Sequence, residues 1–214
     1  MNRLETLFST LHFQVQIYKN LRAREILQVI NSYAFQTDHS NYDCFVCCIL
    51  SHGENGGKLV SFEGSKFTLN EVTSPFRASV CPSLSAKPKV FLVQACRGEE
   101  YQTCGNFEAD FNYEADFNCK EMNYSVPDFA DFLIGYATVA GFRAHRHRLQ
   151  GSVFIQTLCE TIESFATRLD FLGIFTKVNE KISRMEFEGP PGTDWKTKQI
   201  PELKSTLTRR LFFT

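Results

Sequence analysis

Two reactive side chains directly follow apolar runs of the sequence. Cys96 comes after the run KVFLVQA, and His52 comes one residue after the run CFVCCIL. Both runs are short and rich in β-branched and aromatic residues, which is typical of strands buried on both faces of a sheet. The carboxyl ends of parallel strands meet at the ligand-facing edge of an α/β sheet, so we expect the thiol and the imidazole to lie together there. A thiol beside an imidazole base can act as a nucleophile.

The cysteines allow other interpretations. A single free cysteine is most often a small buried apolar side chain, and this sequence has eight cysteines. Cys44 and Cys47 form a C-x-x-C pattern that zinc-binding and redox proteins also use, but no second pair follows at zinc-finger spacing. We therefore favour a buried strand for this run, with a zinc or redox function as a minor alternative, and we expect no metal and no cofactor.

The composition fits one intracellular globular domain. The sequence has 214 residues, of which 43% are hydrophobic and 22% are charged, and its net charge is −1. This balance offers no general attraction to nucleic acid or to anionic membranes. The amino terminus is amphipathic rather than signal-like, and no apolar segment is long enough to span a membrane. The length and the aliphatic content do not require a disulfide framework, so we expect a reducing, cytoplasmic compartment.

Strand-like and helix-like segments alternate along the chain. Alternating strands and helices predict an α/β three-layer sandwich, in which helices flank a mostly parallel central sheet. The segments with helical spacing are residues 3–12, 21–34, 68–76, 152–165 and 171–185. The strand-like segments are residues 13–18, 44–50, 90–94, 132–138 and 203–213, with a hairpin over 58–67.

Residues 99–125 differ in composition from the rest of the chain. Asn, Asp, Glu, Gly and Tyr dominate there, and FEADFN at 107–112 is nearly repeated as YEADFN at 113–118. A segment of this length without apolar periodicity indicates a long exposed loop, and such loops in compact domains are usually functional or disordered.

Two motifs resemble the caspase family of cysteine endopeptidases. SHGENGG at 51–57 precedes KPKVFLVQACRG at 87–98, and the second contains the family pattern Q-A-C-[RQG]-G with a histidine upstream. Further segments resemble the family in the expected order: RLETLFSTLHFQV, ILQVINSYAFQTDHSNYDCFVCCILSHG, DFADFLIGYAT, GSVFIQTLCETI and QIPELKSTLTRRLFF. The resemblance covers nearly the whole chain and is closest to effector-type members.

The resemblance implies a Cys-His dyad that cleaves proteins after aspartate in apoptosis or related cascades. Cys96 corresponds to the nucleophile, and His52 to the residue that protonates the departing amine. Backbone N–H groups of Gly53 and Cys96 correspond to the oxyanion hole. An arginine fork suits the recognition of a carboxylate.

The resemblance also assigns the substrate pocket. Gln94 and Arg146 match the glutamine and the second arginine that hold the substrate aspartate. Arg143 and His145, on either side of Ala144, stand where effector-type members have aromatic walls for the residue before that aspartate. The family's first pocket arginine and first core strand lie upstream of the segment with which this sequence begins. We therefore expect an incomplete pocket and an unpaired sheet edge, and we do not expect Arg3 to reach the pocket.

Processing and partners follow from the same resemblance. The predicted division is a large-subunit part at 1–110, a cleavable linker at 111–124 and a small-subunit part at 125–214. Asp110 and Asp116, each preceded by Glu-Ala, are the predicted processing sites of a zymogen. The expected partners are protein substrates with exposed aspartates, a second processed copy in a homodimer, and inhibitor-of-apoptosis proteins. The alternative function is a weakly active or non-enzymatic caspase-like protein that regulates by pairing with a full-length caspase.

Overall fold

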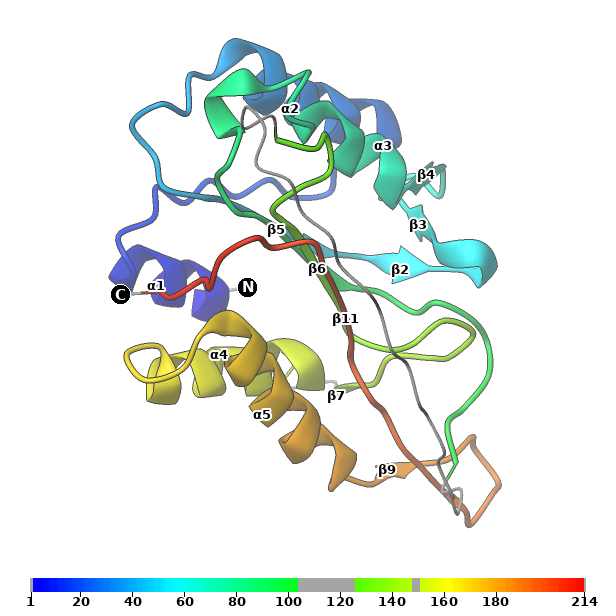
Figure 1. Cartoon of the computed structure of the whole chain (residues 1–214). Helices are drawn as coiled ribbons and strands as arrows, with labels where there is room; N and C mark the ends of the chain where they lie inside the picture. The colour runs from blue at the N-terminus through cyan, green and yellow to red at the C-terminus, as the bar shows by residue number, and fades with distance from the viewer. Residues whose placement is uncertain (1, 104–125, 148–150, 214) are drawn as a thin grey trace, which may run out of the picture.

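A central sheet with helices on both faces organises the chain (Figure 1). The computed structural model describes residues 2–103, 126–147 and 151–213. The four-stranded central sheet has the order β1-β5-β6-β11. Its strands are β1 (Phe45–Leu50), β5 (Lys89–Gln94), β6 (Phe132–Tyr136) and β11 (Glu202–Ser205). β1, β5 and β6 run parallel and β11 runs antiparallel to β6, which confirms the mostly parallel sandwich.

Five α-helices in the described part of the chain form the outer layers. They are α1 (Asn2–Thr10), α2 (Ala23–Gln36), α3 (Leu69–Thr73), α4 (Val153–Phe165) and α5 (Phe171–Ser183). Figure 1 shows α2 and α3 on one side of the sheet and α1, α4 and α5 on the other. Each side has its own apolar core, and the strands of the sheet contribute side chains to both cores. The predicted helices are confirmed in position, with Ser152 as the N-cap of α4.

Three small ladders and three short 3₁₀ helices complete the described fold. β2 (His52–Gly53), β3 (Lys58–Val60) and β4 (Lys66–Thr68) form one antiparallel ladder. The other two ladders pair β7 (Arg146–His147) with β8 (Gly151–Ser152), and β9 (Phe187–Glu188) with β10 (Lys196–Thr197). The 3₁₀ helices are η1 (Asn55–Gly57), η2 (Ser74–Phe76) and η3 (Pro82–Leu84). None of the helices described here is both long and apolar enough to cross a membrane.

β5 is the buried centre of the sheet. All of its residues are buried, as expected for a parallel strand covered on both faces. It begins at Lys89, whose buried ammonium group donates to the backbone oxygens of Leu84 (3.1 Å) and Lys87 (2.9 Å) and lies 5.0 Å from the ring centre of Phe132. Burial lowers the pKa of Lys89. These contacts allow a charged residue to begin a buried strand.

The prediction of a strand at residues 13–18 is wrong. This segment belongs to no ladder, although residues 13–16 still alternate between half-buried and exposed side chains. Phe13 packs against Phe8 and Phe213, with ring centres 5.1 and 5.7 Å away, and Val15 contacts the same core. The alternation therefore records contact with the α1 and α4 layer rather than strand pairing. β1 pairs with β5 and with no other strand of the described chain, so it is the predicted unpaired edge.

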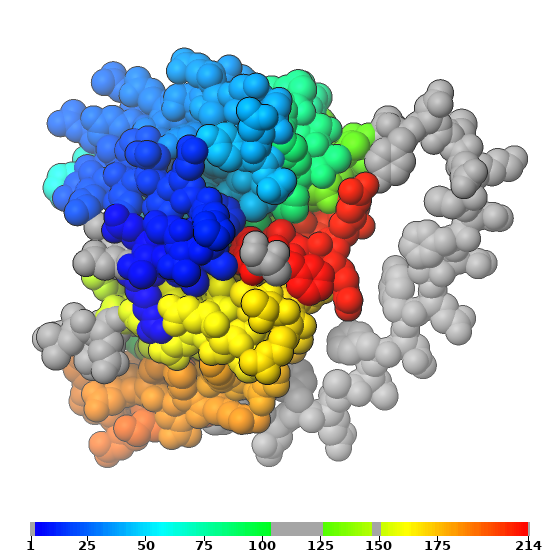
Figure 2. Space-filling view, turned by 90° about the vertical axis from the view of Figure 1, so that its left-hand side faces the viewer, coloured from blue at the N-terminus to red at the C-terminus, as the bar shows by residue number. Residues whose placement is uncertain are grey.

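The closing strand is also shorter than predicted. A strand over residues 203–213 is wrong beyond Ser205, where β11 ends. The backbone N–H and hydroxyl of Thr208 then both donate to one oxygen of the buried Asp131 carboxylate, at 2.9 and 2.7 Å. Leu211 and Phe213 end in the core instead of continuing the sheet. Figure 2 shows this C-terminal segment in red beside the dark blue amino-terminal residues.

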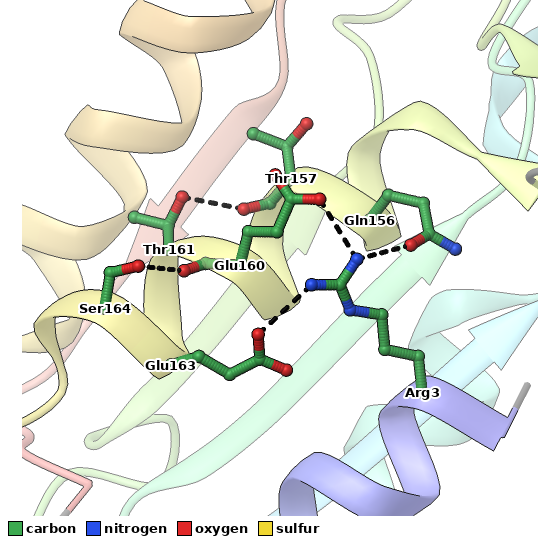
Figure 3. Close-up of polar contacts among 7 residues, drawn as sticks. All are labelled: Arg3, Gln156, Thr157, Glu160, Thr161, Glu163 and Ser164. Atoms are coloured by element: carbon green, nitrogen blue, oxygen red, sulfur yellow. Dashed lines mark hydrogen bonds and ion pairs between the residues drawn. The ribbon is translucent and has the colours of Figure 1, made fainter.

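Arg3 fastens α1 to α4. Its guanidinium donates to Gln156 (2.7 Å), Glu160 (3.0 Å) and Glu163 (3.1 Å), all on the facing side of α4 (Figure 3). The side chains of Arg3, Glu160 and Glu163 are between 33% and 51% exposed, so water weakens each pair. The guanidinium of Arg3 is therefore engaged by α4.

We expect Arg3→Met to lower the free energy of unfolding by about 1 kcal/mol, because several partly exposed ion pairs form one cluster. Urea denaturation measures this change, and it should shrink in 1 M salt. Lys177→Met is the matched control, since it removes only one exposed pair with Glu180 within α5. Equal effects of the two substitutions would contradict a role for Arg3 in holding α1.

The sheet joins segments on both sides of residues 104–125. β5 precedes this stretch and β6 and β11 follow it, yet β5 pairs with β6 along five aligned positions from Lys89 opposite Phe132 to Val93 opposite Tyr136. We expect a chain cut at a protease site inserted after residue 112 to stay together as one particle. Size-exclusion chromatography with light scattering measures this, and the uncut chain is the control. Separation of the two fragments without denaturant would contradict this topology.

Candidate active site

The pairing of β1 with β5 sets the position of the two reactive side chains. Leu50 stands opposite Gln94 at the ends of these parallel strands, and the N–H of Ser51 donates to the Gln94 carbonyl oxygen at 3.0 Å. His52 and Cys96 each lie two residues beyond this last pair. The structure thus places the exposed imidazole of His52 and the half-buried thiol of Cys96 at the same sheet edge.

Gly53 lies directly against the backbone of Cys96. A Cβ at residue 53 would come within 2.1 Å of the Cys96 carbonyl oxygen and 3.1 Å of the Ala95 Cβ. No other residue type fits such an approach without a backbone shift. The glycine therefore allows the loop after β1 and the loop after β5 to meet.

A backbone segment from the second half of the chain holds the thiol. The Ala144 N–H donates to Cys96 Sγ at 3.5 Å, and the Ala144 carbonyl oxygen lies 3.9 Å from the same sulfur. Gly98 extends this junction, because a Cβ there would overlap the Gly141 carbonyl oxygen at 1.9 Å. Gly141 in turn donates its N–H to the Arg97 carbonyl oxygen at 3.0 Å. Residues 96–98, in the loop after β5, and residues 141–144 thus form one packed unit.

Burial makes three of the other described cysteines poor nucleophiles. Burial raises the pKa of Cys44 to about 11, of Cys47 to about 12 and of Cys159 to about 11, so almost no thiolate forms at neutral pH. Cys44 packs toward the α4 core and Cys47 toward the α2 core, on opposite faces of the sheet. The C-x-x-C pair therefore cannot bind one metal ion together. Within the described ranges, no group of three or more His, Cys, Asp or Glu side chains could hold a metal.

Arg97 anchors the loop after β5 to β11, the far strand of the sheet. Its largely buried guanidinium pairs with Glu202 at the start of β11, donates to the Thr138 carbonyl oxygen at 3.2 Å and lies 4.0 Å from the ring centre of Tyr136. In the sequence, Arg97 has no evident role beyond its place in the motif, and Glu202 is not recognisable as its partner. The only signal was a charged residue directly after the predicted nucleophile, since its partner lies far along the chain.

Gln94 and Arg146 meet through Ser152. The Ser152 hydroxyl accepts from the Ile155 N–H at 3.2 Å, as the cap of α4, and donates to the side-chain oxygen of Gln94. Ser152 is also the ladder partner of Arg146 in the β7–β8 hairpin. Gln94 is buried and Arg146 is exposed. The structure therefore brings these two predicted pocket residues together around a serine that the sequence analysis treated only as a helix cap.

The imidazole of His145 is held by packing and by a hydrogen bond. Its ring stacks on Phe187 with centres 4.2 Å apart, and its Nε2 lies 3.2 Å from the Thr197 hydroxyl. Its backbone N–H donates to Gln199 at 2.6 Å. Burial lowers the pKa of His145, which favours the neutral ring.

Arg143 is exposed on the other side of Ala144. Its Nε donates to the Glu99 carbonyl oxygen at 2.9 Å, and its guanidinium lies 4.9 Å from the ring centre of Tyr101. Asp110 and Asp116, the predicted processing sites, lie outside the described residues.

Known proteins are similar to this chain in sequence and in fold. Residues 1–212 match the peptidase C14 family, described as the caspase domain. Mouse caspase-8 is 37% identical over 98% of this chain, and mouse caspase-3 is 38% identical over 98%. The crystal structure of caspase-1 from Spodoptera frugiperda superposes with a TM-score of 0.87 at 33% identity, covering 99% of this chain and 79% of that one.

The match covers nearly all of this chain but only part of the relatives' length. The chain spans 43% of mouse caspase-8 and 73% of mouse caspase-3. The family match nevertheless covers nearly all of this chain, and the sheet, the flanking helices and the QACRG segment all agree with it. The chain belongs to the caspase family.

Proposed function

We propose that this chain is an aspartate-directed cysteine endopeptidase with a Cys96–His52 dyad. The observation that carries the proposal is the in-register pairing of β1 with β5, which brings both side chains to one edge of the sheet. His52 takes the proton of the thiol as Cys96 Sγ attacks the scissile carbonyl carbon, and the N–H groups of Gly53 and Cys96 stabilise the resulting oxyanion. The C–N bond then breaks as His52 protonates the departing amine, leaving a thioester that water hydrolyses.

Gln94 and Arg146 form the proposed aspartate pocket. The Ser152 hydroxyl occupies the side-chain oxygen of Gln94, so the amide NH₂ of Gln94 remains to donate to a substrate carboxylate. Arg146, across the hairpin from Ser152, adds an exposed guanidinium. A neutral donor and a positive fork together suit a short carboxylate side chain.

Arg97 is a positioning residue in this proposal. It touches no part of the proposed pocket, but it ties the residue next to the nucleophile to β11 through Glu202. Because its charge is compensated by Glu202 and by backbone oxygen, it orients the loop without competing for the substrate.

Processing belongs to the same proposal. We propose that cleavage at Asp110 or Asp116 separates a large-subunit part at 1–110 from a small-subunit part at 125–214. The two parts would stay joined after such a cut, because the Asp128 carboxylate accepts the Ser79 N–H at 2.8 Å and β5 pairs with β6. The processed enzyme would act in apoptosis as a cytoplasmic homodimer, with inhibitor-of-apoptosis proteins as regulators.

A second function is favoured by the edge strand. β1 has a ladder partner on one side only within the described chain, and its side chains are half-buried or exposed. A caspase-like chain with an open sheet edge could pair with a longer family member and regulate it without cleaving substrates.

The first function is tested by covalent labelling. We expect a peptidyl fluoromethyl ketone that ends in aspartate to modify Cys96 and no other described cysteine, and to react at least 10-fold faster than the asparagine analogue, because a charge-assisted pair is lost. Intact and peptide mass spectrometry measure the rate and the site. Cys44→Ala is the control that should label normally, and Cys96→Ala should not label.

Equal rates with the two reagents, or an adduct on another cysteine, would contradict the aspartate-directed dyad. An unlabelled chain that binds a longer caspase in a pull-down would favour the regulatory function instead.

A further inference from the structure

The basic segment at residues 143–146 passes directly beside the thiol of Cys96. Ala144 in this segment contacts Cys96 Sγ through both its N–H and its carbonyl oxygen. Arg143 precedes Ala144, and His145 and Arg146 follow it. Consecutive Cα atoms are about 3.8 Å apart, and an extended peptide advances about 3.3 Å per residue. Arg143 is one residue from Ala144, so a peptide that runs extended along this segment with its attacked residue at Ala144 has the neighbouring residue beside Arg143.

The Arg143 guanidinium is ordered before any ligand arrives. Its Nε is held by the Glu99 carbonyl oxygen, its plane is supported by the ring of Tyr101, and its backbone N–H donates to the Glu100 carbonyl oxygen at 2.9 Å. Tyr101 is itself fixed edge-on against Trp195, with ring centres 5.9 Å apart. Less side-chain entropy is lost when such a group binds a ligand.

The charge of Arg143 is not compensated. Arg97, its neighbour in space, is paired with Glu202, and Arg77 and Arg210 each have an aspartate partner. Among the described residues Arg143 forms no ion pair, and its only side-chain hydrogen bond is the one from Nε to the Glu99 carbonyl oxygen. An exposed, ordered and unpaired guanidinium beside a nucleophile is suited to a second anionic group on the substrate.

We propose that Arg143 binds the carboxylate of an acidic residue immediately before the cleaved aspartate. The inference rests on the proposed function, because it takes Cys96 as the nucleophile and Gln94 and Arg146 as the aspartate pocket. His145 does not compete for this role, since its ring is stacked on Phe187 and bonded to Thr197. The preferred substrates then have two consecutive acidic residues directly before the cleaved bond. The chain's own repeats have Ala109 and Ala115 at this position, so Arg143 serves other proteins rather than the linker.

The test compares labelling of Cys96 by two reagents, acetyl-Ala-Glu-Asp and acetyl-Ala-Gln-Asp fluoromethyl ketone. They differ only in the charge of the residue before aspartate. We expect the full chain to react roughly 3- to 10-fold faster with the Glu reagent, between the effect of an exposed ion pair and that of a charge-assisted hydrogen bond. The ratio of the Glu rate to the Gln rate should fall toward one in 0.5 M salt and in Arg143→Gln. It should be intermediate in Arg143→Lys, which keeps the charge but lacks the fork. It should be unchanged in Arg24→Gln, an exposed control on α2.

The outcomes separate the two proposals. Equal rates for the Glu and Gln reagents, with aspartate still preferred over asparagine, would overturn the role of Arg143 and leave the aspartate pocket standing. A Glu preference that survives in Arg143→Gln would overturn it as well. Loss of all aspartate-dependent labelling would overturn the proposed function and this inference with it. If Arg143→Gln fails to fold by circular dichroism, the Arg143→Lys ratio and the salt dependence decide, and an unchanged ratio in both contradicts the inference.

Discussion

The contact between Gly53 and the backbone of Cys96 is the constraint on which the site depends. It follows from the parallel pairing of β1 and β5, which ends with Leu50 opposite Gln94. A side chain at residue 53 would overlap the Cys96 carbonyl oxygen, so the two loops meet only because one of them is glycine there. The rest of the site is built around this junction: residues 141–144 pack on its other side, and Ala144 holds the sulfur.

Positive charge is treated in two ways around β5. Lys89 at its start and Arg97 beyond its end are largely buried, and backbone oxygens or Glu202 satisfy their charges. Arg143 and Arg146 are exposed and form no ion pair within the described chain. The first two residues hold the sheet and the loop after β5 in place. The last two leave positive charge available at the edge of the site, which agrees with an acidic substrate.

Much of this structure can be predicted from the sequence, because the signals are local. Apolar periodicity located the helices and the strands β1, β5 and β6, and strand ends followed by reactive residues located His52 and Cys96. The strand predicted at residues 13–18 failed because alternation reports burial, and burial of Phe13 against Phe8 and Phe213 needs no ladder. The prediction of a strand over 203–213 was wrong beyond Ser205, because the N–H of Thr208 donates to Asp131 instead of continuing the ladder.

Contacts between distant segments could not be predicted in this way. The Arg97–Glu202 pair depends on β11 lying antiparallel beside β6, and the support of Arg143 by Tyr101 depends on the meeting of two loops.

The contact between Gly53 and Cys96 is tested most directly by the rate at which the aspartyl fluoromethyl ketone labels Cys96 in Gly53→Ala. We expect the labelling rate to fall roughly 10²-fold or more while the secondary structure is retained. The added Cβ must displace the loop after β1, and the N–H of residue 53, one of the two oxyanion donors, moves with it. Labelling at the rate of the unsubstituted chain would contradict the account.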